Sequence, residues 1–286
     1  MEFTKIGGGA SPKSSHWVNY EVRRAFLNRY TRPHRRIRLS RVAEAHLFNL
    51  PSMTRTGGGS PVALVDVGAA GGVQRKWARH RRRISPVMFE PNPAEAARLR
   101  GSLSTRTCAL VIELGLGGTA GAYTLNPAHW PGRTSLLTPD PTVLAGYKIA
   151  PLFEKVKQVT VECVRFDELH RAGNVPAPDV IKVDVEGYEY EVLSGFGELL
   201  PGVLGFEAEA WFYPDFNGQK LPDNLVELLS SFGLQLRRIE PAPGFEGDLV
   251  CVNAYSTRGK AGQPKLTEEQ RPKFSQLQRV WGLDDI

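Results

Sequence analysis

The chain has 286 residues, of which 41% are apolar and 23% are charged, a balance that excludes wholesale disorder and suits one or two globular α/β domains. Its apolar runs are only a few residues long, which predicts no transmembrane helix, and residues 1–10 lack the apolar core of a secretory signal. Three widely spaced cysteines exclude a disulfide scaffold and a Cys-x-x-Cys zinc site, so we expect a cytoplasmic protein.

The formal net charge of +6 is concentrated at the N-terminus, because residues 1–60 hold eleven Lys and Arg against three Asp and Glu. Apolar residues at helical spacing predict an amphipathic helix over residues 14–30, and a second helix is expected to begin at Ser40 and to end near residue 49. The glycines of Thr56–Ser60 indicate a flexible joint. We therefore expect a basic helical arm over residues 1–60.

Strand and helix patterns alternate after this joint. Strands are predicted at residues 62–67, 86–90, 107–114, 159–164, 179–184, 203–208, 234–239 and 249–254, and helices at 73–83, 93–104, 166–171, 189–200 and 223–232. Continuous apolar strands that alternate with helices indicate a mostly parallel sheet covered on both faces, which the last two strands close as an antiparallel pair. This domain should span residues 61–256, followed by a tail with a short helix over residues 257–286.

The long segment Asn126–Pro151 interrupts this alternation and is rich in Pro, Gly, Thr and Ser. It is longer than a connection between neighbouring elements requires, and such loops are usually functional lids or disordered. Its aromatic residues, together with those after the strand at 203–208, suit either stacking on a sugar or adenine or ordinary packing. They are Trp130, Tyr147, Trp211, Phe212, Tyr213 and Phe216.

A ligand-binding turn is predicted directly after the first strand. Asp66 lies at the strand's end, and the small residues Gly68–Gly72 allow a ligand to approach the backbone before a helix begins. Glu90 ends the second strand, where an acidic side chain can accept hydrogen bonds from both hydroxyls of a ribose. The glycine spacing differs from G-x-G-x-x-G, which disfavours a nicotinamide cofactor, and a P-loop is absent from the sequence. The alternative is a tight turn with no ligand.

A second polar segment surrounds the strand at 179–184. Lys182, Asp184 and Glu186 alternate with apolar residues, so in an extended chain they share one face. A lysine buried in a strand is costly without a carboxylate partner, which places this strand end at a polar cleft beside the glycine turn. An ion-paired strand end without a catalytic role is the alternative.

Three segments together resemble the FkbM-type family of S-adenosylmethionine-dependent methyltransferases: Val65–Gly72, Phe89–Pro93 and Ile181–Gly195. The resemblance extends over about residues 62–255, includes Pro131–Leu137 and Phe206–Gln219, and is most specific in the K-x-D-x-E-G pattern of the third segment. It implies a class I Rossmann-like fold: a mostly parallel seven-stranded sheet with helices on both faces and an antiparallel last strand.

The resemblance also implies the activity, which is O-methylation of a hydroxyl on a sugar, glycolipid or secondary metabolite. The alternatives are an N-methyltransferase of a peptide or amine, and a non-catalytic binding module that uses the basic arm. The residues carried over for S-adenosylmethionine and its product S-adenosylhomocysteine are Asp66, Gly68, Ala69, Gly72, Glu90, Asn92 and Asp184. Asp66, Gly68 and Gly72 would hold the methionine end, Glu90 the ribose, and Asp184 would lie beside the sulfonium. The family often has Asn where this chain has Ala70, so that side-chain contact is absent.

An aliphatic alcohol is barely ionised at neutral pH, so a base or a metal must help to remove its proton. The candidate bases are Asp184, Glu186, Glu207 and His129, and Glu209 can face the same cleft as Glu207. A divalent cation held by Asp184 and a glutamate is conceivable but not favoured, because no histidine cluster accompanies these carboxylates. His129 also suits an ordinary loop residue.

The partner that the sequence predicts is a small-molecule or glycan acceptor. Basic residues gather in the arm and again, as arginines, in residues 75–83. They suit a solvated surface, peripheral contact with an anionic membrane, or RNA binding, although the sequence has no specific nucleic-acid motif.

Overall fold

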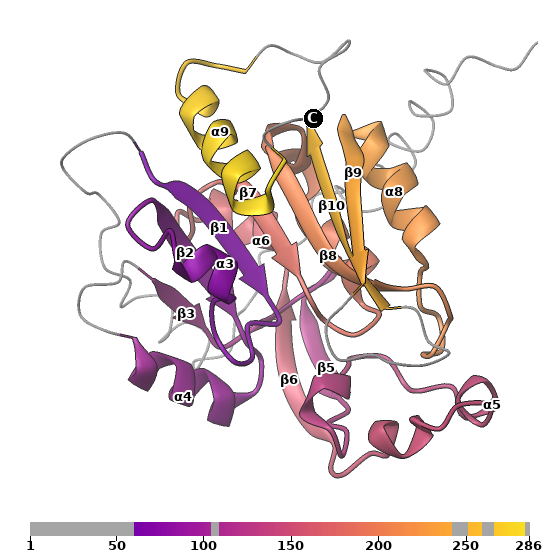
Figure 1. Ribbon diagram of the computed structural model, residues 1–286. Coiled ribbons are helices and arrows are strands. Elements are labelled where there is room, and N and C mark those ends of the chain that lie inside the picture. The colour runs from indigo at the N-terminus through magenta and orange to yellow at the C-terminus, as the bar shows by residue number, and fades with distance from the viewer. Residues whose placement is uncertain (1–59, 104–108, 242–250, 259–265, 284–286) are drawn as a thin grey trace, which may run out of the picture.

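The computed structural model describes residues 60–103, 109–241, 251–258 and 266–283 (Figure 1). The basic arm predicted over residues 1–60 lies outside them except for Ser60, and so does the first part of the strand predicted at 107–114. Among the helices of the described segments, none has the length and apolar character needed to cross a membrane.

Seven strands form the main sheet, in the order β3-β2-β1-β7-β8-β10-β9. They are β1 (Val62–Val67), β2 (Ile84–Phe89), β3 (Leu110–Ile112), β7 (Val180–Val183), β8 (Gly205–Trp211), β9 (Leu234–Pro241) and β10 (Cys251–Arg258). Neighbouring strands are parallel except in the two pairs that β10 makes with β8 and β9. The structure therefore confirms the expected Rossmann-like class I sheet with its antiparallel last strand.

Helices cover the sheet because the strands are apolar on both faces, and every residue of β1 is buried. Helix α4 (Pro93–Ser102) begins where the Asn92 side chain accepts a hydrogen bond from the Ala94 amide at 3.1 Å. Helix α8 (Pro222–Ser231) turns three leucines into the core, and α6 (Phe166–Arg171) occupies the range that the sequence predicts. Two predicted helices are shorter than expected.

The short helices have local causes. Helix α3 covers only Arg75–Ala78 and continues as turns up to the start of β2. The helix predicted over 189–200 ends as α7 (Glu189–Ser194), since Gly197 has φ 47°, and a 3₁₀ segment with Pro201 inside it follows (Gly197–Gly202).

A second, three-stranded sheet has the order β4-β6-β5, with β4 at Gly115–Leu116, β5 at Gly121–Leu125 and β6 at Val159–Val164. The strand predicted at 159–164 exists, but it belongs to this sheet and not to the main one. The long segment 126–151 is built from short pieces, including the 3₁₀ turn Pro131–Arg133 and helix α5 (Pro141–Leu144). In Figure 1 these elements lie below the main sheet, at the end where β1 and β7 finish.

Helix α9 (Gln270–Trp281) lies beside α3 on one face of the main sheet (Figure 1). Leu277 and Trp281 are buried in a core cluster shared with Trp77, whose ring meets that of Trp281 edge-on at 6.0 Å. The helix lies so close to β8 that a Cβ atom on Gly205 would come within 2.7 Å of both side chains. The C-terminal helix is thus part of the packed body.

Candidate active site

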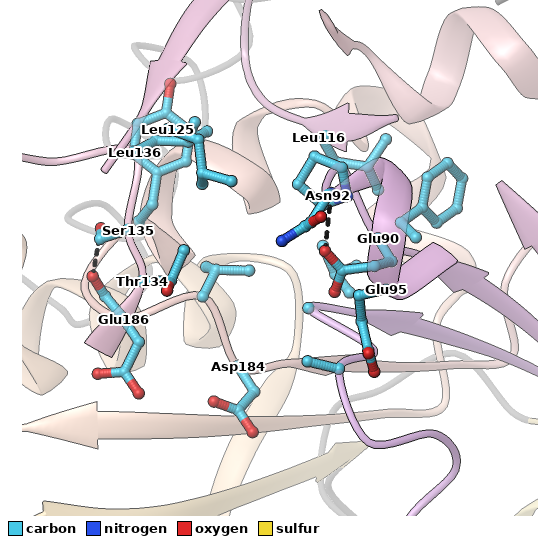
Figure 2. A pocket seen from close by; sticks show the side chains of 18 of the residues that line it. Glu90, Asn92, Glu95, Leu116, Leu125, Thr134, Ser135, Leu136, Asp184 and Glu186 are labelled. Atoms are coloured by element: carbon cyan, nitrogen blue, oxygen red, sulfur yellow. Dashed lines mark hydrogen bonds between the residues drawn. The ribbon is translucent and has the colours of Figure 1, made fainter. Parts of the chain in front are cut away.

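A cavity of about 680 Å³ opens at the carboxyl ends of β1, β2 and β7. The glycine turn and the start of α4 form one wall, and the small sheet with residues 131–132 and 134–136 forms the other. Its polar lining residues include Glu90, Asn92, Glu95, Thr134, Ser135, Asp184 and Glu186. Figure 2 shows Glu90 and Asn92 across the cavity from Ser135 and Glu186, with Asp184 between them. This is the edge of an open α/β sheet where ligands bind.

The glycine turn after β1 fits closely against the end of β7. Gly68 has φ 72°, and a Cβ atom there would lie 1.9 Å from the backbone oxygen of Asp184, so only glycine fits. A Cβ atom on Gly71 would meet no described heavy atom within 4 Å. The turn therefore leaves room for a ligand to approach its backbone.

Glu90 follows β2 and is 6% exposed. Its Oε1 accepts a hydrogen bond from the Asn92 amide at 2.9 Å, and burial raises the pKa of the carboxyl to about 7. A buried carboxylate with remaining acceptor positions suits a pair of neighbouring hydroxyl groups such as those of a ribose.

Lys182 on β7 lies in register with Asp66 on β1. Its Nζ is 3.1 Å from Asp66 Oδ1 and 3.3 Å from Asp184 Oδ2, and it donates to the Gly68 carbonyl at 3.3 Å. Burial alone would lower the pKa of Lys182, but the two carboxylates, Asp66 foremost, raise it above its ordinary value. Burial raises the pKa of Asp66 to about 6 against the opposing effect of Lys182. This buried cation fixes the glycine turn and the end of β7 to each other.

Glu186 projects into the pocket from the turn after β7 and has φ 53°, a left-handed conformation that non-glycine residues rarely adopt. Its Oε2 is 2.5 Å from Nη1 of Arg133, and its backbone carbonyl accepts a hydrogen bond from Ser135 Oγ at 2.7 Å (dashed in Figure 2). Burial, followed by the nearby charge of Glu209, raises the pKa of Glu186 well above its ordinary value. The carboxylate is therefore a stronger base than one in water.

Carboxylate oxygens of Asp184, Glu186 and Glu209 come within 4.8 Å of one another, a spacing at which oxygen ligands can share a divalent cation. Asp184 and Glu186 have cationic partners of their own, since Lys182 is paired with Asp184 and Arg133 with Glu186. The positive charge at this site is thus supplied in part by the chain itself.

The structure brings four of the predicted cofactor residues to the pocket, Gly68, Glu90, Asn92 and Asp184, but three lie behind its wall. Asp66 is 2% exposed and paired with Lys182, and Ala69 is buried in the core beneath α4. Gly72 lies against Leu99. These three residues shape the turn from behind, while the backbone of residues 68, 70 and 71 faces the cavity.

Two candidate bases, Asp184 and Glu186, line the pocket, and the other two do not. Glu207 is 1% exposed beneath α9, where it accepts hydrogen bonds from Lys76 Nζ at 2.5 Å and from Trp281 Nε1 at 3.0 Å. On β8 it lies in register with Lys182. Glu209 is two residues nearer to the carboxyl end of the same strand. The expectation that Glu207 faces the cleft is therefore wrong. His129 is exposed, and its backbone amide donates to the Glu154 carbonyl.

Sequence reasoning missed the apolar wall of the pocket and the role of Arg133. The wall consists of Leu114, Leu116, Leu125 and Leu136, from the small sheet and its flanks, and of Tyr188, which directly precedes α7. Arg133 is 1% exposed, although the loop that carries it is polar in sequence. Of the aromatic candidates, Trp211 and Phe216 are buried, whereas Trp130, Phe212 and Tyr213 are 57%, 45% and 42% exposed.

Comparisons with known proteins agree with this geometry. The profile of a family described as "Methyltransferase FkbM domain" matches residues 66–233. Hexuronic acid methyltransferase AglP of Haloferax volcanii is 35% identical over 118 residues, which are 40% of this chain and 42% of that protein. 2-O-methyltransferase NoeI of Sinorhizobium fredii is 24% identical over 196 residues, 66% of this chain and 79% of that protein.

Among solved structures, magnesium protoporphyrin IX methyltransferase from Synechocystis PCC 6803 aligns with 88% of this chain and 100% of its own, at 8% identity and a TM-score of 0.39. The match to the family profile covers more than half of the chain, including the glycine turn, Glu90 and both carboxylates after β7. The chain therefore belongs to the FkbM family of S-adenosylmethionine-dependent methyltransferases.

Proposed function

We propose that this protein transfers the methyl group of S-adenosylmethionine to a hydroxyl of a sugar or glycan. The observation that carries the proposal is the placement of Asp184 and Glu186 in one cavity with Glu90 opposite them. Two relatives, a hexuronic acid methyltransferase and a 2-O-methyltransferase, point by their names to the same class of acceptor.

The cofactor site that we propose uses the glycine-turn wall of the cavity. Glu90 accepts hydrogen bonds from the ribose hydroxyls, and the backbone of Gly68 and Gly71 lies along the rest of the nucleoside and the methionine. Leu114 and Leu116 supply apolar surface for the adenine. When bound, S-adenosylmethionine supplies an electrophilic methyl group.

The acceptor hydroxyl needs a base on the opposite side of the cavity. Asp184 and Glu186 are the carboxylates that line it there, and burial has raised the pKa of Glu186. A carboxylate whose pKa is raised above its ordinary value is a stronger base for removing the proton of a hydroxyl. Most of the remaining acceleration comes from holding the oxygen in line with the methyl carbon.

A sugar suits the rim of this cavity. Trp130 directly precedes the lining residues Pro131 and Gly132, and it is 57% exposed. Aromatic faces stack on the apolar faces of sugar rings, and the hydroxyls of Thr134 and Ser135 add polar contacts inside.

The test is a mass-shift assay with S-adenosylmethionine and methyl glycosides of neutral hexoses and of hexuronic acids. We expect a gain of one methyl group on a hydroxyl of at least one sugar, and a slower but measurable gain in Glu186→Gln. A parallel panel of amines and peptides separates the alternatives. Methylation of a nitrogen with none on any hydroxyl would contradict the proposal, and so would failure to bind S-adenosylhomocysteine at millimolar concentration.

A further inference from the structure

We propose that Arg133 is a positioning residue that holds the Glu186 carboxylate at the acceptor side of the cavity and so governs the rate of methyl transfer. The inference deepens the proposed function and rests on it. Arg133 is absent from the residues that line the cavity and is not expected to touch the acceptor or the cofactor. Its effect passes through Glu186.

The first argument is the environment of the guanidinium. Arg133 is 1% exposed, and its Cζ lies 4.2 Å from the ring centroid of Trp211 and 5.5 Å from that of Phe153. Two aromatic rings thus fix the plane of the guanidinium, and its Nη1 is directed to Glu186 Oε2 at 2.5 Å. A planar, preorganised donor orients its acceptor more tightly than a flexible ammonium does.

The second argument is the geometry of Glu186 itself. A non-glycine residue at φ 53° has backbone strain that the surrounding structure must offset. Arg133 holds the side chain of Glu186, and Ser135, two residues further along the same loop, holds its backbone carbonyl at 2.7 Å. The Ser135 oxygen also accepts from the Leu137 amide at 3.0 Å. The 131–137 segment therefore fixes both ends of this residue.

The third argument is the balance of charge. Asp184, Glu186 and Glu209 bring three carboxylates together, and like charges at this distance repel one another. Lys182 lies beneath Asp184, and Arg133 approaches Glu186 from the loop. Asp215, 0% exposed, is also close enough for Arg133 to lower the pKa of its carboxyl, which burial raises to about 6. Without Arg133, Glu186 would turn away from its neighbours.

Stability alone explains this arrangement poorly. Replacing a buried ion pair with well-packed apolar residues is often neutral or stabilising, so burial of a guanidinium is weak evidence for a role in stability. The chain contains a matched comparison in Arg165. It is 2% exposed, pairs with Asp167 at 2.6 Å and donates to the Gly118 carbonyl, yet neither it nor Asp167 lines the cavity.

The experiment compares Arg133→Lys, Glu186→Gln, the double variant and the control Arg165→Lys, all in the full chain. The acceptor is the methyl glycoside that the wild type methylates. We expect Arg133→Lys to lower kcat about tenfold while the Kd of S-adenosylhomocysteine changes less than about threefold. In the Glu186→Gln background the same substitution should change kcat less than about twofold, because the two residues act as one unit. Arg165→Lys should lower Tm without lowering kcat.

An acceptor-free measurement accompanies the kinetics. Amide hydrogen exchange over residues 183–189 should be faster in Arg133→Lys than in the wild type and unchanged in Arg165→Lys. A folded Arg133→Lys with wild-type kcat, independent losses in the double variant, or unchanged exchange over 183–189 would each overturn the proposal. A wild type that methylates no hydroxyl would instead contradict the proposed function, and the exchange comparison would still decide the role of Arg133.

Discussion

The Gly68 α-carbon and the backbone oxygen of Asp184 lie so close together that a single methyl group between them would be 1.9 Å from that oxygen. The contact is reinforced from beneath, where Lys182 donates to the Gly68 carbonyl and pairs with Asp184. The turn after β1 and the turn after β7 therefore form one rigid floor for the cavity, and the proposed cofactor and acceptor sites share it.

The first prediction concerns this floor. Gly68→Ala combines the overlap with a left-handed φ of 72°, so the two turns must separate. We expect it to abolish measurable S-adenosylhomocysteine binding in calorimetry and to cost at least about 2 kcal/mol of unfolding free energy. Gly173→Ala is the matched control: its φ is 78°, no described heavy atom lies within 4 Å of the added carbon, and the residue does not line the cavity. Equal losses in both variants would show that backbone strain, and not the contact, is responsible.

The second prediction concerns Glu90, whose pKa burial raises to about 7. Its carboxylate form is the stronger acceptor of ribose hydroxyls, so lowering the pH through 7 protonates it and weakens binding. S-adenosylhomocysteine affinity should fall from pH 8 to pH 6, by at most about tenfold per unit below the pKa. Glu90→Gln should bind more weakly at pH 8 and show a flat profile. An identical pH dependence in that variant would assign the titration to another group.

The third prediction separates Glu207 from catalysis. Glu207→Gln removes the charge that faces Lys76 while leaving an acceptor for Trp281. We expect a loss of about 1–3 kcal/mol in urea unfolding with unchanged cofactor affinity. The comparison is Glu240→Gln, which breaks the exposed pair with Arg238 and should cost less than about 0.5 kcal/mol. A large loss of kcat in folded Glu207→Gln would restore Glu207 as a catalytic candidate.

The fourth prediction concerns Glu189, which is 3% exposed and accepts hydrogen bonds from the Gly187 and Val185 amides at 3.1 and 3.3 Å. Burial raises its pKa from 4.5 to about 8. The folded state therefore holds this proton more tightly than the unfolded state, and Glu189 makes stability fall as the pH rises between about 4.5 and 8. Glu189→Gln should remove this slope. The free energy of unfolding of the variant should therefore rise relative to that of the wild type from pH 5 to pH 8, by up to about 1.4 kcal/mol per pH unit. Parallel urea curves at all pH values would refute the assignment.

The centre of the main sheet was predictable because β1, β2 and β7 are mostly apolar runs, and β2 is followed by a helix with a recognisable start at Asn92-Pro93. The small sheet was not, because β4 has two residues and most of β5 is exposed, so hydrophobic periodicity gives little signal there. Strand β6 looks like any other strand in sequence, and only its pairing with β4 and β5 removes it from the main sheet.

The candidate site was partly predictable for a related reason. Asp184 and Glu90 follow strands, and the carboxyl ends of parallel strands meet at one edge. Glu207 and Glu209 both alternate with apolar residues in the sequence, so the pattern does not distinguish them. In the structure Glu207 lies in register with Lys182 and is covered by α9, whereas Glu209 lies near Asp184 and Glu186. The burial of Arg133 was not predictable from its own loop, because it depends on Trp211, which is 78 positions away in the chain.

Helix α9 has a practical consequence for anyone who shortens this protein. A chain cut after residue 258 keeps every strand that the structure describes, but it uncovers Gly205 and Trp77 and removes the Trp281 donor from Glu207. That fragment would expose the apolar patch around Leu64, Trp77 and Leu204 that α9 covers, a surface of the kind that drives aggregation. Expression of the domain should therefore retain the chain at least to Leu283, even though the family profile ends at residue 233.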